Sequence, residues 1–320
     1  MSSILYVVIP CYNEEAVLPE TSKRMKEKMT SLIERNMISK KSRVVFVNDG
    51  SKDETWEIIC RLHEEDALFS GINLSRNRGH QNALLAGLMT VKEIADMVIS
   101  MDADLQDDIN AMDEMIEKFH KGIDIVYGVR NKRQTDTFFK RFTAEGFYRL
   151  MDLLGANTVF NHADYRLMSR RALEGLAQFQ EVNLFLRGLI PMIGYPSDVV
   201  YYERGERFAG ESKYPLKKML AFAVEGITSL SVKPLRMITN VGFFVFLMSI
   251  VILIYSFIRH FMGETIVGWT TLMGSLWAIG GLILLALGIV GEYIGKIYME
   301  TKGRPTYIVE SFVDQETEEL

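Results

Sequence analysis

The stretch Met97-Val-Ile-Ser-Met-Asp-Ala-Asp-Leu-Gln-Asp107 joins a mostly apolar run to a cluster of acidic residues. Residues 97–101 have the composition of a short buried β-strand, and the carboxylates follow where that strand would end. Side chains alternate along an extended backbone, so we expect Asp102 and Asp104 on one side of the chain, at the edge of a sheet. Two close carboxylates repel each other, and Mg²⁺ or Mn²⁺ commonly lies between such a pair and the phosphates of a substrate. The stretch predicts a metal site, although an isolated Asp-x-Asp is also typical of a solvated loop or a helix N-cap.

Short β-branched runs alternate with amphipathic stretches through the first 130 residues. The predicted strands are residues 4–9, 43–47, 70–74, 97–101 and 123–128. This alternation predicts βαβ units and a mostly parallel sheet covered by helices, in which ligands bind at the carboxyl ends of the strands. Cys-Tyr-Asn-Glu follows the first strand, Asn-Asp-Gly-Ser the second and Asp-Ala-Asp the fourth. We therefore expect these three motifs to meet in one crevice.

The motifs after the first two strands allow two interpretations each. Asp49 can accept hydrogen bonds from a base or ribose, or it can serve only the turn that Gly50 permits. Likewise, residues 10–14 can begin a helix or form a floor for a base, with Tyr12 stacking on it. His80 follows a glycine at an expected helix N-terminus, where such residues are often structural, so we assign it no catalytic role.

Composition excludes several other classes. A formal net charge of -5 argues against a general nucleic-acid-binding protein. The two cysteines, Cys11 and Cys60, suit a reducing compartment and provide neither a disulfide framework nor a zinc site. The N-terminal apolar run ends at Pro10 and is too short for a signal peptide, which leaves it as a strand.

Two blocks near the C-terminus, residues 237–258 and 269–291, are apolar and without acidic or basic residues. At 1.5 Å per residue each is long enough to cross a hydrocarbon core of about 30 Å. Buried helices of a soluble core are the alternative, but those usually carry a polar stripe. Basic residues flank the pair on its outer sides: Lys213, Lys217, Lys218, Lys233 and Arg236 before it, and Lys296, Lys302 and Arg304 after it. The connecting loop offers only Arg259, so the positive-inside rule predicts that both termini are cytoplasmic.

The chain therefore divides into a soluble part and a membrane part. We expect a cytoplasmic catalytic domain at residues 1–213 and a juxtamembrane amphipathic helix at 214–235. After these we expect transmembrane helices at 236–258 and 269–291, joined by a short extracytoplasmic loop at 259–268, and a cytoplasmic tail at 292–320. An apolar and basic helix at 138–154 suits a membrane surface. The acidic end of the tail is expected to be solvated and frayed.

Several motifs in this order resemble family 2 glycosyltransferases: Val-Ile-Pro-Cys-Tyr-Asn-Glu-Glu from Val8, Val-Asn-Asp-Gly-Ser from Val47, Leu-Ser-Arg-Asn-Arg-Gly-His-Gln from Leu74 and Asp-Ala-Asp-Leu-Gln-Asp from Asp102. Two later motifs, Ala-Asp-Tyr-Arg-Leu-Met from Ala163 and Glu203-Arg204 to Gly-Glu-Ser-Lys-Tyr at 210–214, resemble the polyprenyl-phosphate glycosyltransferases. That group includes dolichyl-phosphate mannose synthase and the bacterial GtrB-like enzymes. The similarity extends over nearly the whole chain, hairpin included.

The resemblance implies a GT-A (Rossmann-like) α/β fold followed by interfacial helices and a two-helix transmembrane hairpin. It implies that Pro10, Tyr12, Glu14 and Asp49 surround the base and ribose of a nucleotide-sugar, and that Asp102, Asp104 and Gln106 hold the metal and the diphosphate. Arg130 and Arg141 match residues that hold the acceptor phosphate, although Lys140 could replace Arg141. Arg207, Ser212 and Lys213 match a loop over the diphosphate. Asp164 matches the family's candidate base, but a phosphate monoester is largely ionised at neutral pH, so we expect Asp164 mainly to orient Arg166 or the acceptor.

The expected reaction is an inverting, single-displacement transfer of a hexose to undecaprenyl or polyprenyl phosphate, with Mg²⁺ or Mn²⁺. A UDP-sugar of glucose or N-acetylglucosamine is favoured as the donor, and the product would serve glycosylation of the cell envelope. A GDP-mannose-dependent enzyme like dolichyl-phosphate mannose synthase and a non-enzymatic membrane scaffold are the alternatives. A processive polysaccharide synthase is disfavoured, since two spans are too few for a channel and no Gln-x-x-Arg-Trp stretch occurs. Gly291 and Gly295 hint at helix association and a homo-oligomer.

Overall fold

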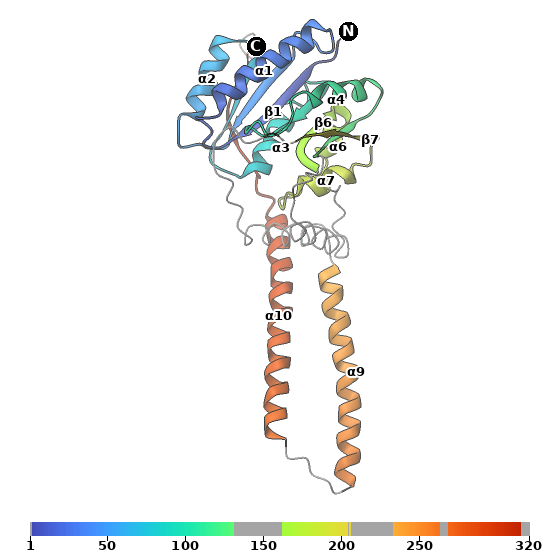
Figure 1. Ribbon diagram of the computed structural model, residues 1–320. Helices are drawn as coiled ribbons and strands as arrows, with labels where there is room; N and C mark the ends of the chain where they lie inside the picture. The colour runs from blue at the N-terminus through green and yellow to red at the C-terminus, as the bar shows by residue number, and fades with distance from the viewer. Residues whose placement is uncertain (1, 131–161, 204, 206–232, 263–267, 315–320) are drawn as a thin grey trace. The chain divides into compact units, whose positions relative to one another are not determined.

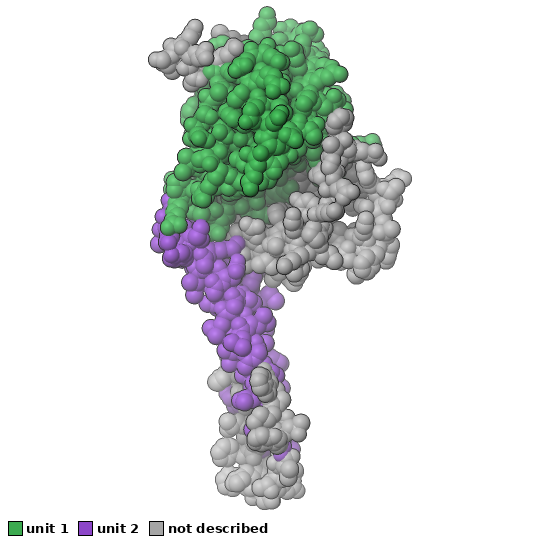
Figure 2. All heavy atoms as spheres, turned by 90° about the vertical axis from the view of Figure 1, so that its left-hand side faces the viewer, with its two compact units in different colours: residues 1–144, 158–214, 304–320 green, residues 145–157, 215–303 purple. Residues whose placement is uncertain are grey.

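A computed structural model describes residues 2–130, 162–203, 205, 233–262 and 268–314. The strands are β1 (Leu5–Cys11), β2 (Arg43–Asn48), β3 (Phe69–Leu74), β4 (Met97–Ser100), β5 (Ile125–Arg130), β6 (His162–Ser169), β7 (Ser197–Tyr202) and β8 (Val309–Val313). The helices are α1 (Leu18–Glu34), α2 (Thr55–Glu65), α3 (His80–Val91), α4 (Ala111–His120), α6 (Arg170–Leu176), α7 (Leu186–Met192), α9 (Lys233–Phe261) and α10 (Trp269–Lys302). The chain forms two compact units, one of residues 1–144, 158–214 and 304–320 and the other of 145–157 and 215–303 (Figures 1 and 2).

In the described part of the first unit, eight strands form one sheet in the order β7-β5-β6-β4-β1-β2-β3-β8. The four central neighbours β4, β1, β2 and β3 are parallel, as the alternation of strands and helices predicts. β6 lies antiparallel between β4 and β5, and β8 pairs antiparallel with the edge of β3. The sheet is therefore mixed, with the parallel centre that places the predicted motifs at one edge.

Helices cover both faces of this sheet because the strand residues alternate between two cores. Leu5, Val7 and Ile9 of β1 pack into one apolar cluster, together with buried residues of α1 and α4. Tyr6 and Val8 point the other way, into a cluster that includes residues of α3, α6 and α7. Both clusters are almost free of solvent, so the sheet is a rigid support for the loops at its carboxyl edge.

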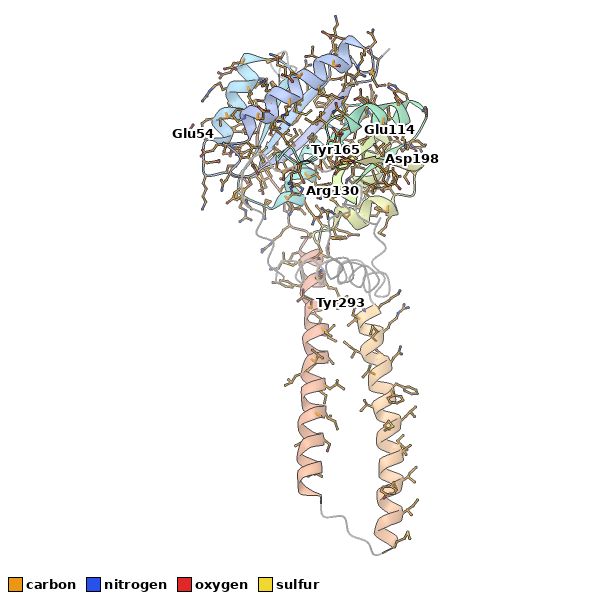
Figure 3. The ribbon with its side chains drawn as sticks, in the orientation of Figure 1. Glu54, Glu114, Arg130, Tyr165, Asp198 and Tyr293 are labelled. Atoms are coloured by element: carbon orange, nitrogen blue, oxygen red, sulfur yellow. The ribbon has the colours of Figure 1, made fainter. Side chains whose placement is uncertain are left out.

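Polar contacts join α4 to the edge strand β7. Lys118 Nζ lies 2.8 Å from Asp198 Oδ2 and 3.3 Å from Glu114 Oε1 (Figure 3). The Tyr165 hydroxyl donates to the Asp108 carbonyl at 3.1 Å, and its ring meets that of Tyr202 edge to face at 5.3 Å. These contacts hold the segment after β4 against β6 and β7.

The second unit contains the long helices α9 and α10, which contact each other. Apolar side chains of α9 such as Phe243 and Phe244 are more than 60% exposed, as are Leu284 and Leu285 of α10. Among the described residues, one helix segment, Ala278–Lys302, meets the length and hydropathy expected of a membrane span, with a mean hydropathy of 1.9. Such surfaces are unusual in water and indicate an apolar environment.

One expectation for the C-terminal region needs correction. The helix that contains the predicted span 269–291 extends to Lys302, where Gly303 adopts φ 54° as its C-cap. The acidic tail is not frayed throughout, because Val309–Val313 forms β8 and Asp314 is only 5% exposed. The helix predicted at 138–154 and most of that at 214–235 lie outside the described residues.

Candidate active site

The loops that follow β1 and β2 are hydrogen-bonded to each other. The Asn13 amide N–H donates to Ser51 Oγ at 3.0 Å, and the Lys52 N–H donates to Asn13 Oδ1 at 2.9 Å. The Glu14 N–H donates to Thr55 Oγ1 at 2.9 Å. Asn13 has a left-handed backbone, with φ 55°, which an asparagine tolerates better than most residues. Sequence reasoning expected both loops at one site, and the structure brings them together.

The predicted base-binding residues differ in exposure. Pro10 is buried within β1, whereas the Tyr12 side chain is 43% exposed and is available to stack on a ligand. Asp49 is buried, and its two carboxylate oxygens accept from the backbone N–H groups of Arg78 at 2.6 Å and Gly79 at 2.9 Å. Burial raises the pKa of Asp49, and these hydrogen bonds oppose the rise. Asp49 therefore fastens the loop before α3 to the end of β2.

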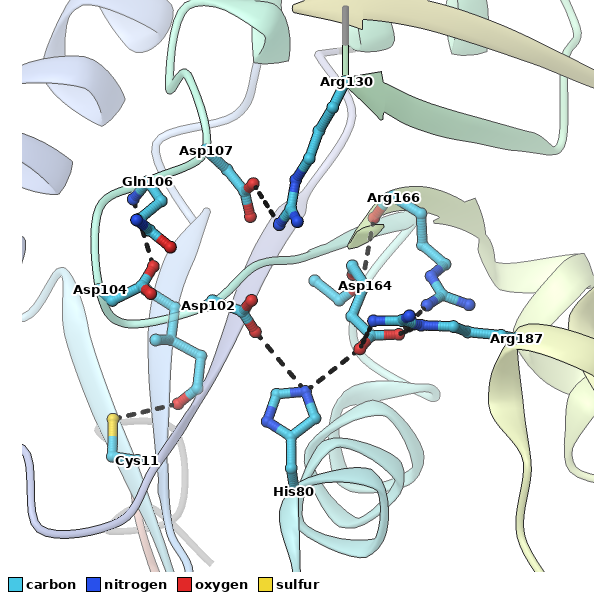
Figure 4. Close-up of polar contacts among 12 residues, drawn as sticks. Cys11, His80, Asp102, Asp104, Gln106, Asp107, Arg130, Asp164, Arg166 and Arg187 are labelled. Carbon is cyan, nitrogen blue, oxygen red and sulfur yellow. Dashed lines mark hydrogen bonds and ion pairs between the residues drawn. The ribbon is translucent and has the colours of Figure 1, made fainter. Parts of the chain in front are cut away.

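The acidic motif after β4 forms a tight loop. The Gln106 N–H donates to Asp104 Oδ1 at 3.2 Å, and Leu105 between them has φ 56°, a rare conformation for a residue with this side chain (Figure 4). Left-handed non-glycine residues cost free energy and cluster at functional sites. The loop thus presents Asp102, Asp104 and Gln106 from a short, constrained piece of backbone.

Asp102 lies on the side of this loop that faces α3. His80 Nε2 is 3.5 Å from Asp102 Oδ1 and 3.5 Å from Asp164 Oδ2, so the imidazole lies between the two carboxylates (Figure 4). Burial raises the pKa of Asp102 to about 6. His80 opposes this rise, and the negative charges of Asp107, Asp164 and Asp104 add to it. A carboxylate in this negative field gains from a cation beside it.

Asp164 on β6 is the centre of a buried ion cluster. Its Oδ1 accepts from Arg166 Nη2 at 2.5 Å and from Arg187 Nε at 3.3 Å, and its Oδ2 accepts from Arg187 Nη2 at 3.0 Å. Arg166 is 1% exposed, whereas the Arg187 side chain, at the start of α7, is 37% exposed. Burial alone would raise the pKa of Asp164, but His80, Arg166 and Arg187 hold it well below its usual value.

A second cluster joins Arg130 to the acidic loop. Arg130 Nη2 is 3.2 Å from Asp107 Oδ1 (Figure 4). The Tyr202 hydroxyl donates to the same oxygen at 2.5 Å. Arg130 Nε donates to the Tyr202 oxygen at 3.1 Å. Asp107 Oδ2 is buried and, within the described residues, has no hydrogen-bond partner. Arg130 is therefore a cation held next to the predicted metal loop.

The structure unites many of the predicted residues and adds others. Five predicted residues lie on adjoining loops and strand ends: Asp102, Asp104, Gln106, Arg130 and Asp164. Four others lie outside the described residues: Arg141, Arg207, Ser212 and Lys213. Sequence reasoning gave no role to His80, Asp107, Arg187 and Tyr202. Asp107 carried a signal, because it ends the quoted acidic motif. Arg187 and Tyr202 carried no such signal, because a single arginine or tyrosine in an apolar segment does not indicate a site.

Comparisons with known proteins agree with this architecture. Residues 6–176 match glycosyl transferase family 2, and residues 233–297 match the GtrB C-terminal hairpin. The uncharacterized glycosyltransferase YkoT of Bacillus subtilis (strain 168) is 52% identical over 99% of this chain and 94% of its own length. The bactoprenol glucosyl transferase of Shigella phage SfX is 39% identical over 95% of this chain and 98% of its own length.

Among solved structures, the mannosyltransferase PcManGT from Pyrobaculum calidifontis, in complex with GDP-Man and Mn²⁺, has 16% sequence identity and a TM-score of 0.44, covering 93% of this chain and 85% of that one.

The mixed sheet with a parallel centre is the GT-A fold that the sequence resemblance implied. The chain belongs to glycosyl transferase family 2, and it carries the hairpin segment found in the GtrB proteins. The hairpin match and the exposed apolar helices indicate that the enzyme associates with a membrane.

Proposed function

We propose that this glycosyltransferase moves a hexose, glucose or N-acetylglucosamine, from a UDP-sugar to undecaprenyl or another polyprenyl phosphate. The observation that carries the proposal is the 39% identity, over 95% of the chain, to a protein named bactoprenol glucosyl transferase. The cations of the site suit the chemistry, since both substrates bear phosphates. The product would donate its sugar to cell-envelope glycosylation.

The donor nucleotide would bind at the loops that follow β1 and β2. Tyr12 is exposed for stacking on the base, while Pro10 and the fixed backbone around Asn13 shape the floor. Asp49 fixes the loop before α3 through the backbone N–H groups of Arg78 and Gly79. It stays a predicted hydrogen-bond acceptor for the base or ribose, because each carboxylate oxygen can accept a second hydrogen bond. Glu14 stays a predicted ribose-binding residue.

A divalent cation fits the residues of the acidic loop. Asp102, Asp104 and Gln106 offer the oxygen ligands that Mg²⁺ and Mn²⁺ prefer, and Asp107 Oδ2 nearby is buried without a protein partner among the described residues. In the part of the chain that the structure describes, no three His, Cys, Asp or Glu side chains are grouped as a metal site. Mg²⁺ is commonly held by one or two carboxylates together with substrate phosphates, and the donor diphosphate would supply such oxygens. A bound cation would neutralise charge on the departing nucleotide diphosphate.

The acceptor phosphate would approach between Arg130 and Arg187. Both guanidinium groups are partly exposed and both are anchored by carboxylates, so they are oriented before the substrate arrives. An ionised phosphate oxygen attacks the anomeric carbon from the face opposite the nucleotide, the C–O bond to the diphosphate breaks, and the configuration inverts. Arg141, Arg207, Ser212 and Lys213 stay predicted phosphate ligands.

The order of the strands supports a hairpin that enters and leaves the membrane on one side. β8 follows α10 in the chain and pairs with β3, so the segments before and after the apolar helices belong to one sheet. A chain with this connectivity crosses a membrane an even number of times. Together with the basic residues that flank the hairpin, this supports a cytoplasmic catalytic unit and cytoplasmic termini.

The test is a transfer assay with membranes that contain the full-length enzyme. Undecaprenyl phosphate is supplied with labelled UDP-glucose, UDP-N-acetylglucosamine, UDP-galactose or GDP-mannose, and an Asp104→Ala enzyme is the matched control. We expect a lipid-linked product from a UDP-sugar, with the β configuration if the donor is α-linked, and none from the control. Transfer from GDP-mannose alone would identify an enzyme like dolichyl-phosphate mannose synthase. If no donor were transferred or hydrolysed, the protein would be a non-enzymatic membrane scaffold.

A further inference from the structure

The strand β8 carries a bulge whose extra residue is Glu310. Ser311 pairs with Asn73 and Val309 pairs with Leu74, which leaves Glu310 between them without a counterpart on β3. Bulges redirect a side chain and are often found near functional sites. The Glu310 Oε2 atom accepts a hydrogen bond from Asn73 Nδ2 at 3.0 Å.

This contact is the first link of a chain of polar groups that runs across the sheet. Asn48 Nδ2, on β2, donates to Asn73 Oδ1 at 2.7 Å. Asn48 Oδ1 in turn accepts from the backbone N–H of Ser51 at 3.2 Å. The chain therefore links β8 to the turn that closes against the loop after β1. The nitrogen of an asparagine amide can only donate and its oxygen can only accept, so the partner on one side of the amide fixes which atom faces the partner on the other side.

The residues just before β8 make a second connection. The Ser75 N–H donates to the Ile308 carbonyl at 3.1 Å, and Arg78 Nη2 donates to the Pro305 carbonyl at 3.3 Å. Ser75 and Arg78 belong to the loop that leads into α3, which Asp49 binds from the other side.

The turn after β2 also packs closely on that loop. A Cβ atom at Gly50 would lie 2.5 Å from the Asn77 nitrogen, and Gly50 has φ 62°. Residues 305–311 thus support the 48–51 turn and the 75–79 loop together.

We propose that residues 305–311, which follow the last membrane helix, position the nucleotide-binding loops, and that Glu310 and Asn73 set the affinity for the donor nucleotide without touching it. The inference rests on the proposed function, which places the nucleotide at these loops. It adds a segment after the hairpin to the determinants of donor binding. A segment that only covered the edge of β3 would stabilise the fold without changing one substrate's affinity more than the other's.

The test uses full-length enzyme in detergent and measures UDP affinity by calorimetry with Mn²⁺, together with kcat, the KM for each substrate and the Tm. Glu310→Ala removes the acceptor of the Asn73 amide, and we expect UDP affinity and donor KM to weaken about three- to tenfold. The KM for polyprenyl phosphate and kcat should stay within about twofold. Glu310→Gln keeps an acceptor oxygen and should bind UDP like the wild type. Glu64→Ala, which removes an exposed carboxylate of α2, is the matched control.

A second pair of variants tests the same series of hydrogen bonds by changing the charge at Asn73 and Glu310. Asn73→Asp places a carboxylate opposite Glu310 and should weaken UDP binding at least as much, whereas Asn73→Asp with Glu310→Gln restores a donor and an acceptor and should recover it. Unchanged UDP affinity in both Glu310→Ala and Asn73→Asp, with or without a lower Tm, would overturn the inference. So would equal losses for donor and acceptor. If the wild-type enzyme itself bound no nucleotide, the proposed function would fail first, and the inference with it.

Discussion

Replacing Asp164 by asparagine separates a general base from a carboxylate that positions arginines. Both oxygens of Asp164 accept hydrogen bonds from the guanidinium groups of Arg166 and Arg187. Burial favours the neutral acid, but His80 and the two arginines hold the pKa of Asp164 well below its usual value, so it is a weak proton acceptor at neutral pH. A phosphate with a second pKa of about 6 needs little deprotonation. We therefore expect the Asp164→Asn enzyme to retain turnover.

The cost of this substitution follows from the burial of the two cations. Arg166 is 1% exposed, and within the described chain its Nε and Nη1 have no hydrogen-bond partner, so the lost charge leaves a buried cation without its counter-ion. Breaking such a pair costs about 3–5 kcal/mol, and the partial exposure of Arg187 reduces this to about 2–4 kcal/mol. At roughly 2–4 °C for each kcal/mol, the Tm should fall by about 5–15 °C. One lost hydrogen bond to a charged group corresponds to a decrease in kcat/KM of about ten- to a hundredfold.

The assay compares the Asp164→Asn, Asp104→Ala and wild-type enzymes below the Tm of each, between pH 6 and pH 9. The positioning role predicts a lower kcat/KM with an unchanged shape of the pH profile. A base role predicts a loss close to that of Asp104→Ala and the disappearance of an ionisation from the kcat profile. That second result, in a variant with nearly wild-type Tm, would refute our reasoning.

Three further predictions concern the metal, one ion pair and the edge strand. Asp104→Ala should abolish Mn²⁺-dependent UDP binding and lower turnover by about 10³-fold or more, measured by calorimetry and the transfer assay. Asp113→Asn should lower the unfolding free energy by about 1 kcal/mol at pH 7, because Asp113 pairs with Lys28 of α1 and with Arg35, which caps the C-terminus of that helix. Burial would raise the pKa of Asp113, but the hydrogen bonds from Lys28 and Arg35 lower it below its usual value. The carboxylate therefore stabilises the fold above about pH 4, and the stability difference between the variant and the wild type should vanish in denaturant titrations as the pH falls below that value. A chain ending at residue 303 should melt at least about 5 °C lower and aggregate, since it lacks Phe312 and exposes the β3 edge.

Each of these has an outcome that would count against it. Unaltered Mn²⁺ dependence in Asp104→Ala would move the cation to other residues. A pH-independent stability difference for Asp113→Asn would mean that packing rather than charge holds α1 to α4. A monomeric truncated chain with native Tm would show that β8 contributes nothing to the sheet.

Local pattern was sufficient to predict the centre of the fold. The strands that end in the acidic motif and in the Asn-Asp-Gly-Ser turn are short, apolar and followed by amphipathic helices, and each pairs with a parallel neighbour as expected. β6 escaped prediction because it carries Asp164 and Arg166, which read as solvent-exposed residues. In the structure they are buried and neutralise each other.

The remaining site residues could not be predicted because they come together only in three dimensions. Tyr202 meets Asp107 across 95 positions of sequence, and Glu310 meets Asn73 across 237. His80 was recognised as a helix N-terminal residue, which is correct, but its two carboxylate neighbours come from β6 and from the loop after β4. No residue spacing encodes such contacts.

The late position of β8 in the chain affects how the enzyme is made. A ribosome synthesises β3 long before β8, and both apolar helices emerge in between. Until then the outer edge of β3 has unpaired backbone groups, which are prone to association with other chains. If the helices insert into the bilayer as proposed, the catalytic sheet is completed only after insertion has returned the chain to its starting side. Membrane integration would then be a step in the folding of the soluble unit, and a misinserted hairpin would leave an incomplete sheet for quality control to recognise.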